Sequence, residues 1–289
     1  MLWIDYHDSI KKIESIRHPV VKQAVIELCT EGFTVLEQVI PSALCDAAIE
    51  DFDKFCNEHV EESKQAMQKE GFRSRLYNLH NIGPACKAVA LAPLVLAVLD
   101  HIFSQRAALN STLFFEQSSQ QHTHRDTPFF TADPYPGEFA GVWFAFEDVH
   151  EDSGPLSYVP GAHKFEVNIS EAREAGNSDP SLVDTMFLNY NAQIQNYISK
   201  NRLKDKLLII KKGDVAIWHP ELPHGGSPIC GVKRSRKSMV AHYIPEGAYI
   251  QTVGYFFGLE EKRKIMEFMD AGDGRLMRWN EYPIFMPNS

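Results

Sequence analysis

The sequence predicts a mainly β protein, an antiparallel barrel or sandwich, whose helical first third packs against the outside of the β core. Apolar residues recur at helical spacing in the first hundred positions, and short apolar runs bounded by Gly and Pro replace them from about Ala107 onward. No linker or repeat divides the 289 residues. We therefore expect one domain over residues 1–289, with helical support in 1–106, the β core in 107–245 and a C-terminal extension in 246–289.

The helical elements come first along the chain. Residues 20–29 carry apolar side chains on one helical face, and Gly32 follows at the expected end of that helix. The run FTVLEQVI at 33–40 predicts a strand. Ser42 is expected to cap a long helix that continues past Phe55, and a further helix is expected over 93–103.

The β elements follow as short apolar runs between turn residues. A Gly–Pro pair precedes the third of them, and Lys212-Gly213-Asp214 divides the fourth into two strands. The predicted strand regions are 111–117, 139–149, 157–161, 206–219 and 238–245. Long connections such as 170–201 are expected to shape a pocket.

Charge and composition exclude some partners. The chain has 29 Lys and Arg against 38 Asp and Glu, a formal charge of −9, which disfavours nucleic acid because phosphate binding needs a basic face. No run approaches the roughly 20 apolar residues of a membrane helix, and charged residues interrupt the first positions, so we expect neither a membrane partner nor a signal peptide. Five scattered cysteines without a C-x-x-C pair indicate reduced thiols and a cytoplasmic protein.

The densest chemistry lies in HTHRD, residues 122–126. In a strand, residues i and i+2 share a face, so His124 and Asp126 can reach one metal ion while Arg125 points outward. His122 shares that face and is an alternative ligand. Because an H-x-D tripeptide is common by chance, histidines satisfied at a strand end remain an alternative interpretation.

A third ligand has two candidates in the segment WHPELPHGGS. His224 precedes two glycines, which permit close approach of the backbone to a site, and we favour it. His219 follows an apolar run and has a simpler role as a strand-end histidine that caps a loop. With two histidines and a carboxylate, the ligand set would be that of a non-haem Fe(II) centre.

A basic cluster precedes the last predicted strand: Lys233, Arg234, Arg236 and Lys237. Most such residues form a solvated turn. A buried arginine would instead be a fitting receptor for a carboxylate, because its guanidinium group donates two parallel hydrogen bonds. Arg236 directly precedes the strand and is the better placed of the two arginines, with Arg234 as the alternative.

Four stretches in this order resemble the phytanoyl-CoA dioxygenase family of Fe(II)- and 2-oxoglutarate-dependent oxygenases. They span most of the chain, from Glu31 to Tyr243. The stretches are EGFTVLEQVIP, QQHTHRDTPFF, EDVHEDSGPLSYVPGAHK, and GDVAIWHPELPHGGS together with RKSMVAHY.

The resemblance implies a double-stranded β-helix, a jelly-roll and cupin-like barrel packed by helices. It implies that Fe(II) is held by His124, Asp126 and His224. It places 2-oxoglutarate on Arg236 with help from Ser227, nine residues earlier. Two glycines follow His224 where relatives usually have one, a shift that a single insertion explains for both residues.

Two further residues are implied to lie near the co-substrate. Trp143 matches a pocket-lining tryptophan, although core packing is an equally simple role for it, and Gln121 matches a polar group three residues before the first ligand.

The expected activity is oxidation, in the first instance hydroxylation, of an unactivated C–H bond in a small or medium metabolite. 2-Oxoglutarate and O2 would be consumed and succinate and CO2 released. The carboxylate of Asp126 favours hydroxylation, because related halogenases replace it with Gly or Ala. The alternatives are a jelly-roll binding protein without turnover and a metal-dependent isomerase or hydrolase with the same triad. The sequence does not predict the substrate or the oligomeric state.

Overall fold

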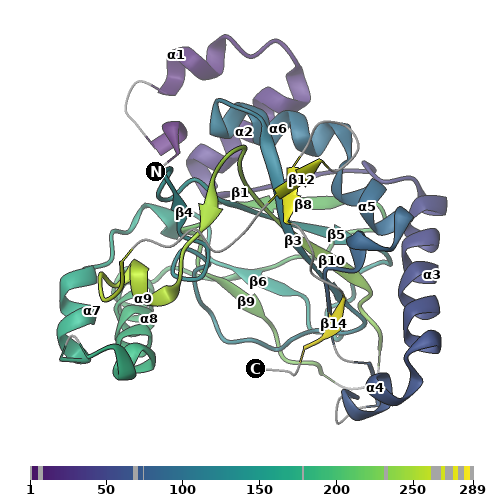
Figure 1. Ribbon diagram of the computed structural model, residues 1–289. Coiled ribbons are helices and arrows are strands. Elements are labelled where there is room, and N and C mark those ends of the chain that lie inside the picture. The colour runs from purple at the N-terminus through teal and green to yellow at the C-terminus, as the bar shows by residue number, and fades with distance from the viewer. Residues whose placement is uncertain are drawn as a thin grey trace.

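The computed structural model places a large sheet opposite a small one (Figure 1). It describes residues 2–5, 9–67, 71–73, 75–177, 179–230, 234–261, 268–270, 276–278 and 283–286. In the large sheet the strand order is β1-β8-β5-β10-β3-β13-β12, and β2 pairs with both β3 and β14. The small sheet has the order β7-β6-β9, and β4 pairs with β11.

The strands have the following bounds: β1 Phe33–Leu36, β2 Leu76–Tyr77, β3 Ala107–Phe115, β4 Ala132–Asp133, β5 Ala140–Ala145, β6 Leu156–Tyr158, β7 Lys206–Leu207, β8 Val215–Trp218, β9 His224–Gly226, β10 Ser238–Pro245, β11 Tyr249–Ile250, β12 Phe268–Asp270, β13 Leu276–Arg278 and β14 Ile284–Phe285. The α-helices are α1 Ser9–Glu14, α2 Pro19–Glu31, α3 Ser42–Glu58, α4 Val60–Gln65, α5 Pro84–Ala90, α6 Pro93–Phe103, α7 Ile169–Ala175, α8 Val183–Lys200 and α9 Val253–Phe256.

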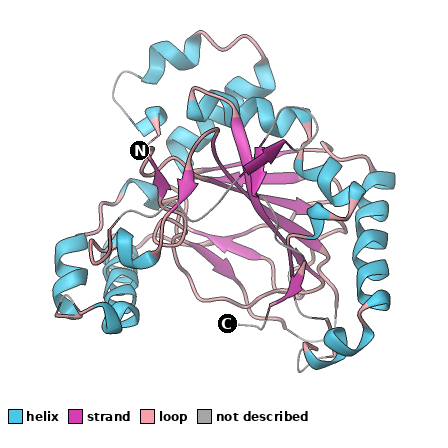
Figure 2. Cartoon of the chain, viewed as in Figure 1, coloured by secondary structure: helices cyan, strands magenta, loops and turns pink. Residues whose placement is uncertain are grey.

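Side-chain alternation gives the large sheet two different faces. On β5, Val142 and Phe144 lie in one buried cluster with α2, α3, α5 and α6, whereas Trp143 and Ala145 lie in another, toward the small sheet. Helices α2, α3, α5 and α6 therefore cover the outer face of the large sheet, as Figure 2 shows. The inner face is left to build a site between the two sheets.

Several sequence predictions meet the structure closely. The helices over 20–29 and 93–103 are present as α2 and α6, and α2 ends at Gly32, whose backbone is left-handed with φ +75°. The strand predicted over 238–245 is β10 with the same bounds. Mainly antiparallel strands form two facing sheets with helices packed against them, a layout that fits the expected jelly roll.

Other boundaries were wrong. The strand predicted over 33–40 stops at Leu36, because Gln38 turns into the left-handed region and donates its N–H to the Asp214 carboxylate. Ser42 lies inside α3, and Pro41 takes the N-cap position without a side-chain hydrogen bond. Most of 170–201, expected as a loop, is helical as α7 and α8.

Within the described part of the chain, no single helix is long and apolar enough to cross a membrane. The bent pair α5 and α6, with 44° between them, meets that test only when the two are taken together, by length and composition.

Candidate metal centre and pocket

His124, Asp126 and His224 lie together between the two sheets. Their ligand atoms all fall within 4.8 Å of one another, and all three residues are largely buried. Nε2 of His124 lies 3.6 Å from one carboxylate oxygen of Asp126, and Nε2 of His224 lies 3.6 Å from the other. Two imidazoles and a carboxylate that leave positions open form the ligand set of a non-haem Fe(II) site.

Backbone pairing brings the two histidine segments together. His124 and His224 exchange both backbone N–H···O bonds, at 2.9 and 3.0 Å, as an isolated antiparallel bridge. His224 begins β9, whereas Asp126 lies in the turn that follows His124. The triad therefore arises from a bridge and a turn, and the expectation that 124–126 is a regular strand was wrong.

Both ligand histidines have a fixed tautomer. Nδ1 of His124 lies 2.7 Å from the carbonyl of His122, and Nδ1 of His224 lies 2.9 Å from the carbonyl of Leu222. A carbonyl oxygen can only accept, so each Nδ1 carries the proton and each Nε2 lone pair is directed at the site. The donor set is thus already arranged for a cation.

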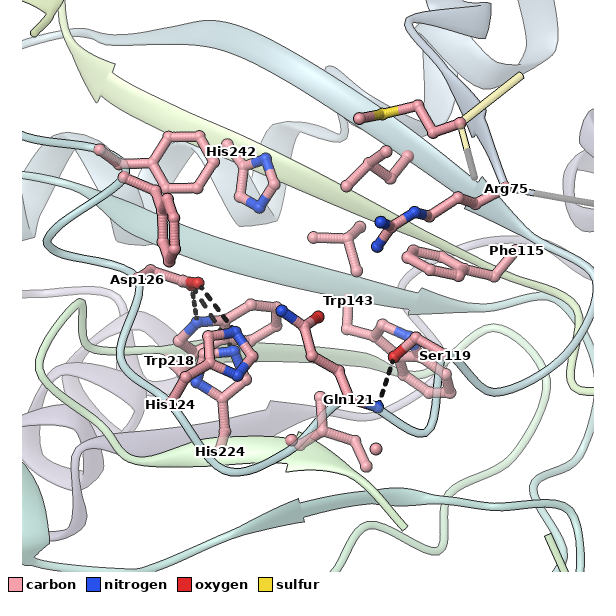
Figure 3. Close-up of a pocket in the computed structure, with 18 of the residues that line it drawn as sticks. Arg75, Phe115, Ser119, Gln121, His124, Asp126, Trp143, Trp218, His224 and His242 are labelled. Carbon is pink, nitrogen blue, oxygen red and sulfur yellow. Dashed lines mark hydrogen bonds and ion pairs between the residues drawn. The ribbon is translucent and has the colours of Figure 1, made fainter. Parts of the chain in front are cut away.

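The Asp126 carboxylate is oriented by the indole of Trp218, whose Nε1–H donates to it at 2.8 Å. Trp218 is almost fully buried and lies opposite Gly141 of the neighbouring strand. A Cβ at position 141 would stand 2.1 Å from the indole ring, so only glycine leaves room for this tryptophan. Figure 3 shows Asp126 directed at His124, His224 and Trp218.

The three ionisable groups of the triad shift one another's pKa values. Burial alone would raise the pKa of Asp126, but the neighbouring imidazoles of His224 and His124 lower it below its usual range. Burial lowers the pKa of His224, which favours the neutral ligand form. Burial also opposes protonation of His124, but its hydrogen bond with Asp126 outweighs burial and the net pKa is raised. A bound cation would displace that proton.

A cavity of about 410 Å3 opens beside the triad. Its volume falls in the range of small-molecule sites, and its wall is mostly apolar with a few polar groups. Its lining beyond the triad comprises Arg75, Leu113, Phe115, Ser119, Gln121, Phe129, Phe130, Trp143, Leu156, Trp218, Gly225, Gly226, Arg236, Val240, His242 and Met286. The expected pocket-shaping segment 170–201 is not among the lining residues, although Phe187 of α8 packs against Phe129, with ring centroids 4.8 Å apart.

Arg236 is a buried cation in the wall of this cavity, 4% exposed. It donates to the Gly154 carbonyl at 2.7 Å and lies over the Trp143 ring at 5.3 Å. Burial lowers its pKa to about 10, and it forms no ion pair with any carboxylate that the structure describes. Its Nε has no hydrogen-bond partner among those residues. A buried guanidinium group in this condition has hydrogen-bond donors to offer an anion.

The other expected co-substrate residues lie close by. Trp143 and Gln121 both line the cavity. Ser227 is not among the lining residues, but its buried hydroxyl lacks a described partner and its N–H donates to Pro155, next to the Gly154 carbonyl that Arg236 holds. The structure thus gathers these side chains around one turn and one cavity wall.

Several rival residues lie elsewhere. Arg234 is 43% exposed and pairs with Asp152, and Lys233 lies outside the described residues. His219 pairs with Asp5 and accepts from the N–H of Glu221, the loop-capping role suggested for it. His122 is exposed and contributes only its carbonyl.

Arg125 contacts groups outside the triad, as strand alternation predicted. It is buried, with 1% of its surface exposed, and pairs with Glu221 at 2.8 Å.

His242 on β10 was missed by sequence reasoning. It lines the cavity, packs against the tilted ring of Phe130 with a centroid distance of 4.3 Å, and places Nδ1 3.0 Å from the Ser111 hydroxyl. Burial lowers its pKa to about 4. A signal existed, because His242 lies six residues after Arg236 and an even spacing on a strand gives the same face.

Solved structures share this fold at low sequence identity. The epimerase SnoN from nogalamycin biosynthesis, described as non-heme and alpha ketoglutarate dependent, aligns with a TM-score of 0.60 and 15% identity over 90% of this chain and 98% of its own. The carbocyclase SnoK of the same biosynthesis aligns at 0.59 with 17% identity over 83% and 88%. HygX from Streptomyces hygroscopicus, solved with nickel and 2-oxoglutarate bound, aligns at 0.53 with 18% identity over 78% and 87%.

Curated relatives and a family model locate the chain further. Phytanoyl-CoA dioxygenase domain-containing protein 1 of Danio rerio is 25% identical over 175 residues, which are 58% of this chain and 54% of the relative. The Rattus norvegicus protein of that name is 25% identical over 150 residues, 50% and 48% of the two chains, so the match spans about half of these relatives. The model of the family phytanoyl-CoA dioxygenase (PhyH) matches residues 28–238. The chain therefore belongs to the phytanoyl-CoA dioxygenase family.

Proposed function

We propose that this protein is an Fe(II)- and 2-oxoglutarate-dependent oxygenase that oxidises an unactivated C–H bond of a small or medium metabolite, with hydroxylation as the reaction. One observation carries the proposal. A His-Asp-His cluster with converging ligand atoms lines the same cavity as the buried Arg236. Among the described residues, no carboxylate forms an ion pair with this arginine. A metal centre and an anion receptor in one cavity are what a chelating co-substrate acid needs.

The residues then have distinct tasks. His124, Asp126 and His224 would hold Fe(II), which supplies oxidation by O2 coupled to conversion of 2-oxoglutarate to succinate and CO2. Arg236, with the Ser227 hydroxyl, would receive the distal carboxylate, and the centre of the Trp143 ring lies 5.3 Å from the guanidinium carbon. Gln121, which lines the same cavity, would donate to the co-substrate or the substrate.

The rest of the cavity suits an organic substrate. Phe115, Phe129 and Phe130 line it and exclude water from the reacting atoms. We assign no nucleic-acid or membrane partner, and we place the activity in a single jelly-roll domain of a cytoplasmic protein. The net charge of −9 supports the first assignment, and five free cysteines support the last.

Anaerobic titration with Fe(II) and 2-oxoglutarate tests the proposal. We expect a weak metal-to-ligand charge-transfer band in the visible for the wild type and for His122→Ala, and none for His124→Ala. His122 is a matched control because it lies two residues away and is exposed. Equal bands for wild type and His124→Ala would refute the assignment, and activity that needs neither 2-oxoglutarate nor O2 would indicate an isomerase or hydrolase instead.

A substrate screen by succinate release then follows. Succinate formation above the uncoupled background identifies the substrate class. A wild type that binds ligands in the cavity without forming succinate under any condition would instead indicate a binding protein.

A further inference from the structure

Glu221 lies in the loop between β8 and β9, three residues before His224, and does not line the cavity. One of its carboxylate oxygens accepts from Arg125 Nη1 at 2.8 Å, and the other accepts from the Thr127 hydroxyl at 2.6 Å. Arg125 and Thr127 are the two neighbours of Asp126. A single carboxylate on the His224 loop therefore holds the chain on both sides of the metal-binding aspartate.

Arg125 is held in place by several contacts besides its ion pair with Glu221. It is 1% exposed, its second arm donates to the Ala162 carbonyl at 2.8 Å, and its guanidinium carbon lies 5.7 Å from the centre of the Phe165 ring. A buried guanidinium group requires a counter-charge, and Glu221 supplies it in an ion pair whose carboxylate is 28% exposed. Removal of the carboxylate would leave a buried charge directly next to Asp126.

The two ligand segments are then joined at two levels. The backbone bridge between His124 and His224 sets the distance between the imidazoles. Asp126 has no such bridge, and its segment continues into the turn over 127–130. The contacts of Glu221 to residues 125 and 127 supply the missing connection between Asp126 and the loop of His224.

Helix α8 adds a third contact. The Tyr190 hydroxyl of this helix lies 3.5 Å from the Glu221 oxygen that Arg125 also uses, and Tyr190 is almost fully buried. The same helix contacts the cavity wall, because its Phe187 packs against the lining residue Phe129. The Glu221 carboxylate thus contacts two segments that are distant from it in sequence, residues 125–127 and helix α8.

We propose that Glu221 is a positioning residue of the metal centre, which sets the Asp126 carboxylate relative to Nε2 of His224 without touching the metal or the co-substrate. The inference rests on the proposed metal site. It adds to that site the Arg125–Glu221 ion pair and the Thr127 hydroxyl, neither of which is a proposed metal ligand.

Mn(II) binding tests this inference without catalysis, because the free ion is followed by electron paramagnetic resonance in the absence of 2-oxoglutarate. We expect Glu221→Ala to raise the Mn(II) Kd by about 10–100-fold, as loss of an outer partner of a metal ligand does. Glu221→Gln keeps an acceptor and should recover part of the affinity. Thr127→Val removes one contact, keeps the ion pair, and should give a smaller rise of a few fold.

Glu246→Ala is the control. Glu246 also pairs with an arginine, Arg106 at 3.0 Å, but on the surface and away from the cavity, so its Mn(II) Kd should equal that of the wild type. The unfolding midpoint of each metal-free variant is measured alongside. A merely structural role would lower the midpoint and leave the Kd of the folded protein unchanged.

The outcomes separate the two claims. Wild-type Mn(II) affinity in folded Glu221→Ala or, if that variant does not fold, in Thr127→Val would overturn the role of Glu221. A wild type that binds Mn(II) but shows no charge-transfer band with Fe(II) and 2-oxoglutarate would overturn the oxygenase proposal, while the Mn(II) titrations would still decide the role of Glu221.

Discussion

Two buried arginines, one next to Asp126 in the sequence and one in the cavity wall, invite comparison. Arg125 and Arg236 are 1% and 4% exposed, each donates to one backbone carbonyl, and each lies near an aromatic ring. They differ in charge balance. Arg125 pairs with a carboxylate at 2.8 Å, whereas Arg236 pairs with none in the described part of the chain.

The carboxylate that most affects the pKa of Arg236 already accepts hydrogen bonds from other residues. Glu147 raises the pKa of Arg236 against the effect of burial, but its oxygens accept from the Ser235 hydroxyl and the Lys237 N–H. A buried cation with a partner holds the structure together, and a buried cation without one carries a desolvation cost that a ligand can offset. The difference thus separates a structural role from a binding role for the same residue type.

The largest expected effect is on co-substrate binding. Arg236→Met should raise the Kd for 2-oxoglutarate by on the order of 100-fold, about 2.7 kcal/mol, because a buried charge pair with the ligand is lost. Unfolding of the metal-free protein should be unaffected or slightly less favourable, since an unpaired buried charge is removed. Calorimetry in the presence of Mn(II) measures the Kd, with Arg234→Met as the surface control. Loss of affinity in the control instead would reassign the receptor.

Arg125→Met should show the opposite pattern in a urea titration. We expect the unfolding free energy of the metal-free protein to fall by about 2 kcal/mol, less than the 3–5 kcal/mol of a fully buried pair because Glu221 is 28% exposed. Equal destabilisation by Arg125→Met and Arg236→Met would break the comparison, since both cations would then be structural.

A buried group with a hydrogen bond but no countercharge provides an intermediate case. Burial lowers the pKa of His80 to about 3, while Nδ1 contacts the Thr112 hydroxyl at 2.8 Å. The unfolded chain binds a proton near pH 6.5, so stability is complete above that pH and falls as the pH drops toward 3, by about 1 kcal/mol per pH unit. His80→Gln should reduce this slope in urea titrations between pH 7 and 5, whereas the exposed control His122→Gln should retain it. Equal slopes would show that His80 does not titrate on unfolding.

The smallest effect is expected at Ser227. Its hydroxyl has no described partner, so Ser227→Ala removes one potential hydrogen bond to the co-substrate, worth about 1 kcal/mol or roughly fivefold in the Kd for 2-oxoglutarate. The unfolding midpoint should not change. A larger loss than that of Arg236→Met would place the receptor at the serine.

Local sequence patterns predicted individual helices and strands. They did not predict features that depend on contacts between residues distant in the sequence. Strand β10 and helix α2 follow from alternation and from the glycine at position 32, both of which are encoded within a few residues. The pairing of His124 and Asp126 with His224 was accessible from spacing and family resemblance. Strand alternation predicted the direction of Arg125 but not its burial, because its partner Glu221 lies 96 residues away in the sequence.

The same limit explains the missed helix α8. Its apolar positions face a small cluster with α7 and Phe257 that no local signal connects to the cavity. His242 was overlooked for a different reason, because a histidine in an apolar strand is usually a satisfied core residue. Its even spacing from Arg236 was the available signal, and both residues line the cavity.

The close approach of Gly141 and Trp218 has a consequence for the history of the protein. Any side chain at 141 collides with the indole that orients Asp126, so position 141 cannot gain a side chain while Trp218 is kept. We expect the two positions to co-vary among relatives: where 141 gains a side chain, 218 loses its tryptophan. Such lineages would have acquired a different donor to the metal-binding carboxylate, and they mark where the chemistry of the family could have diverged.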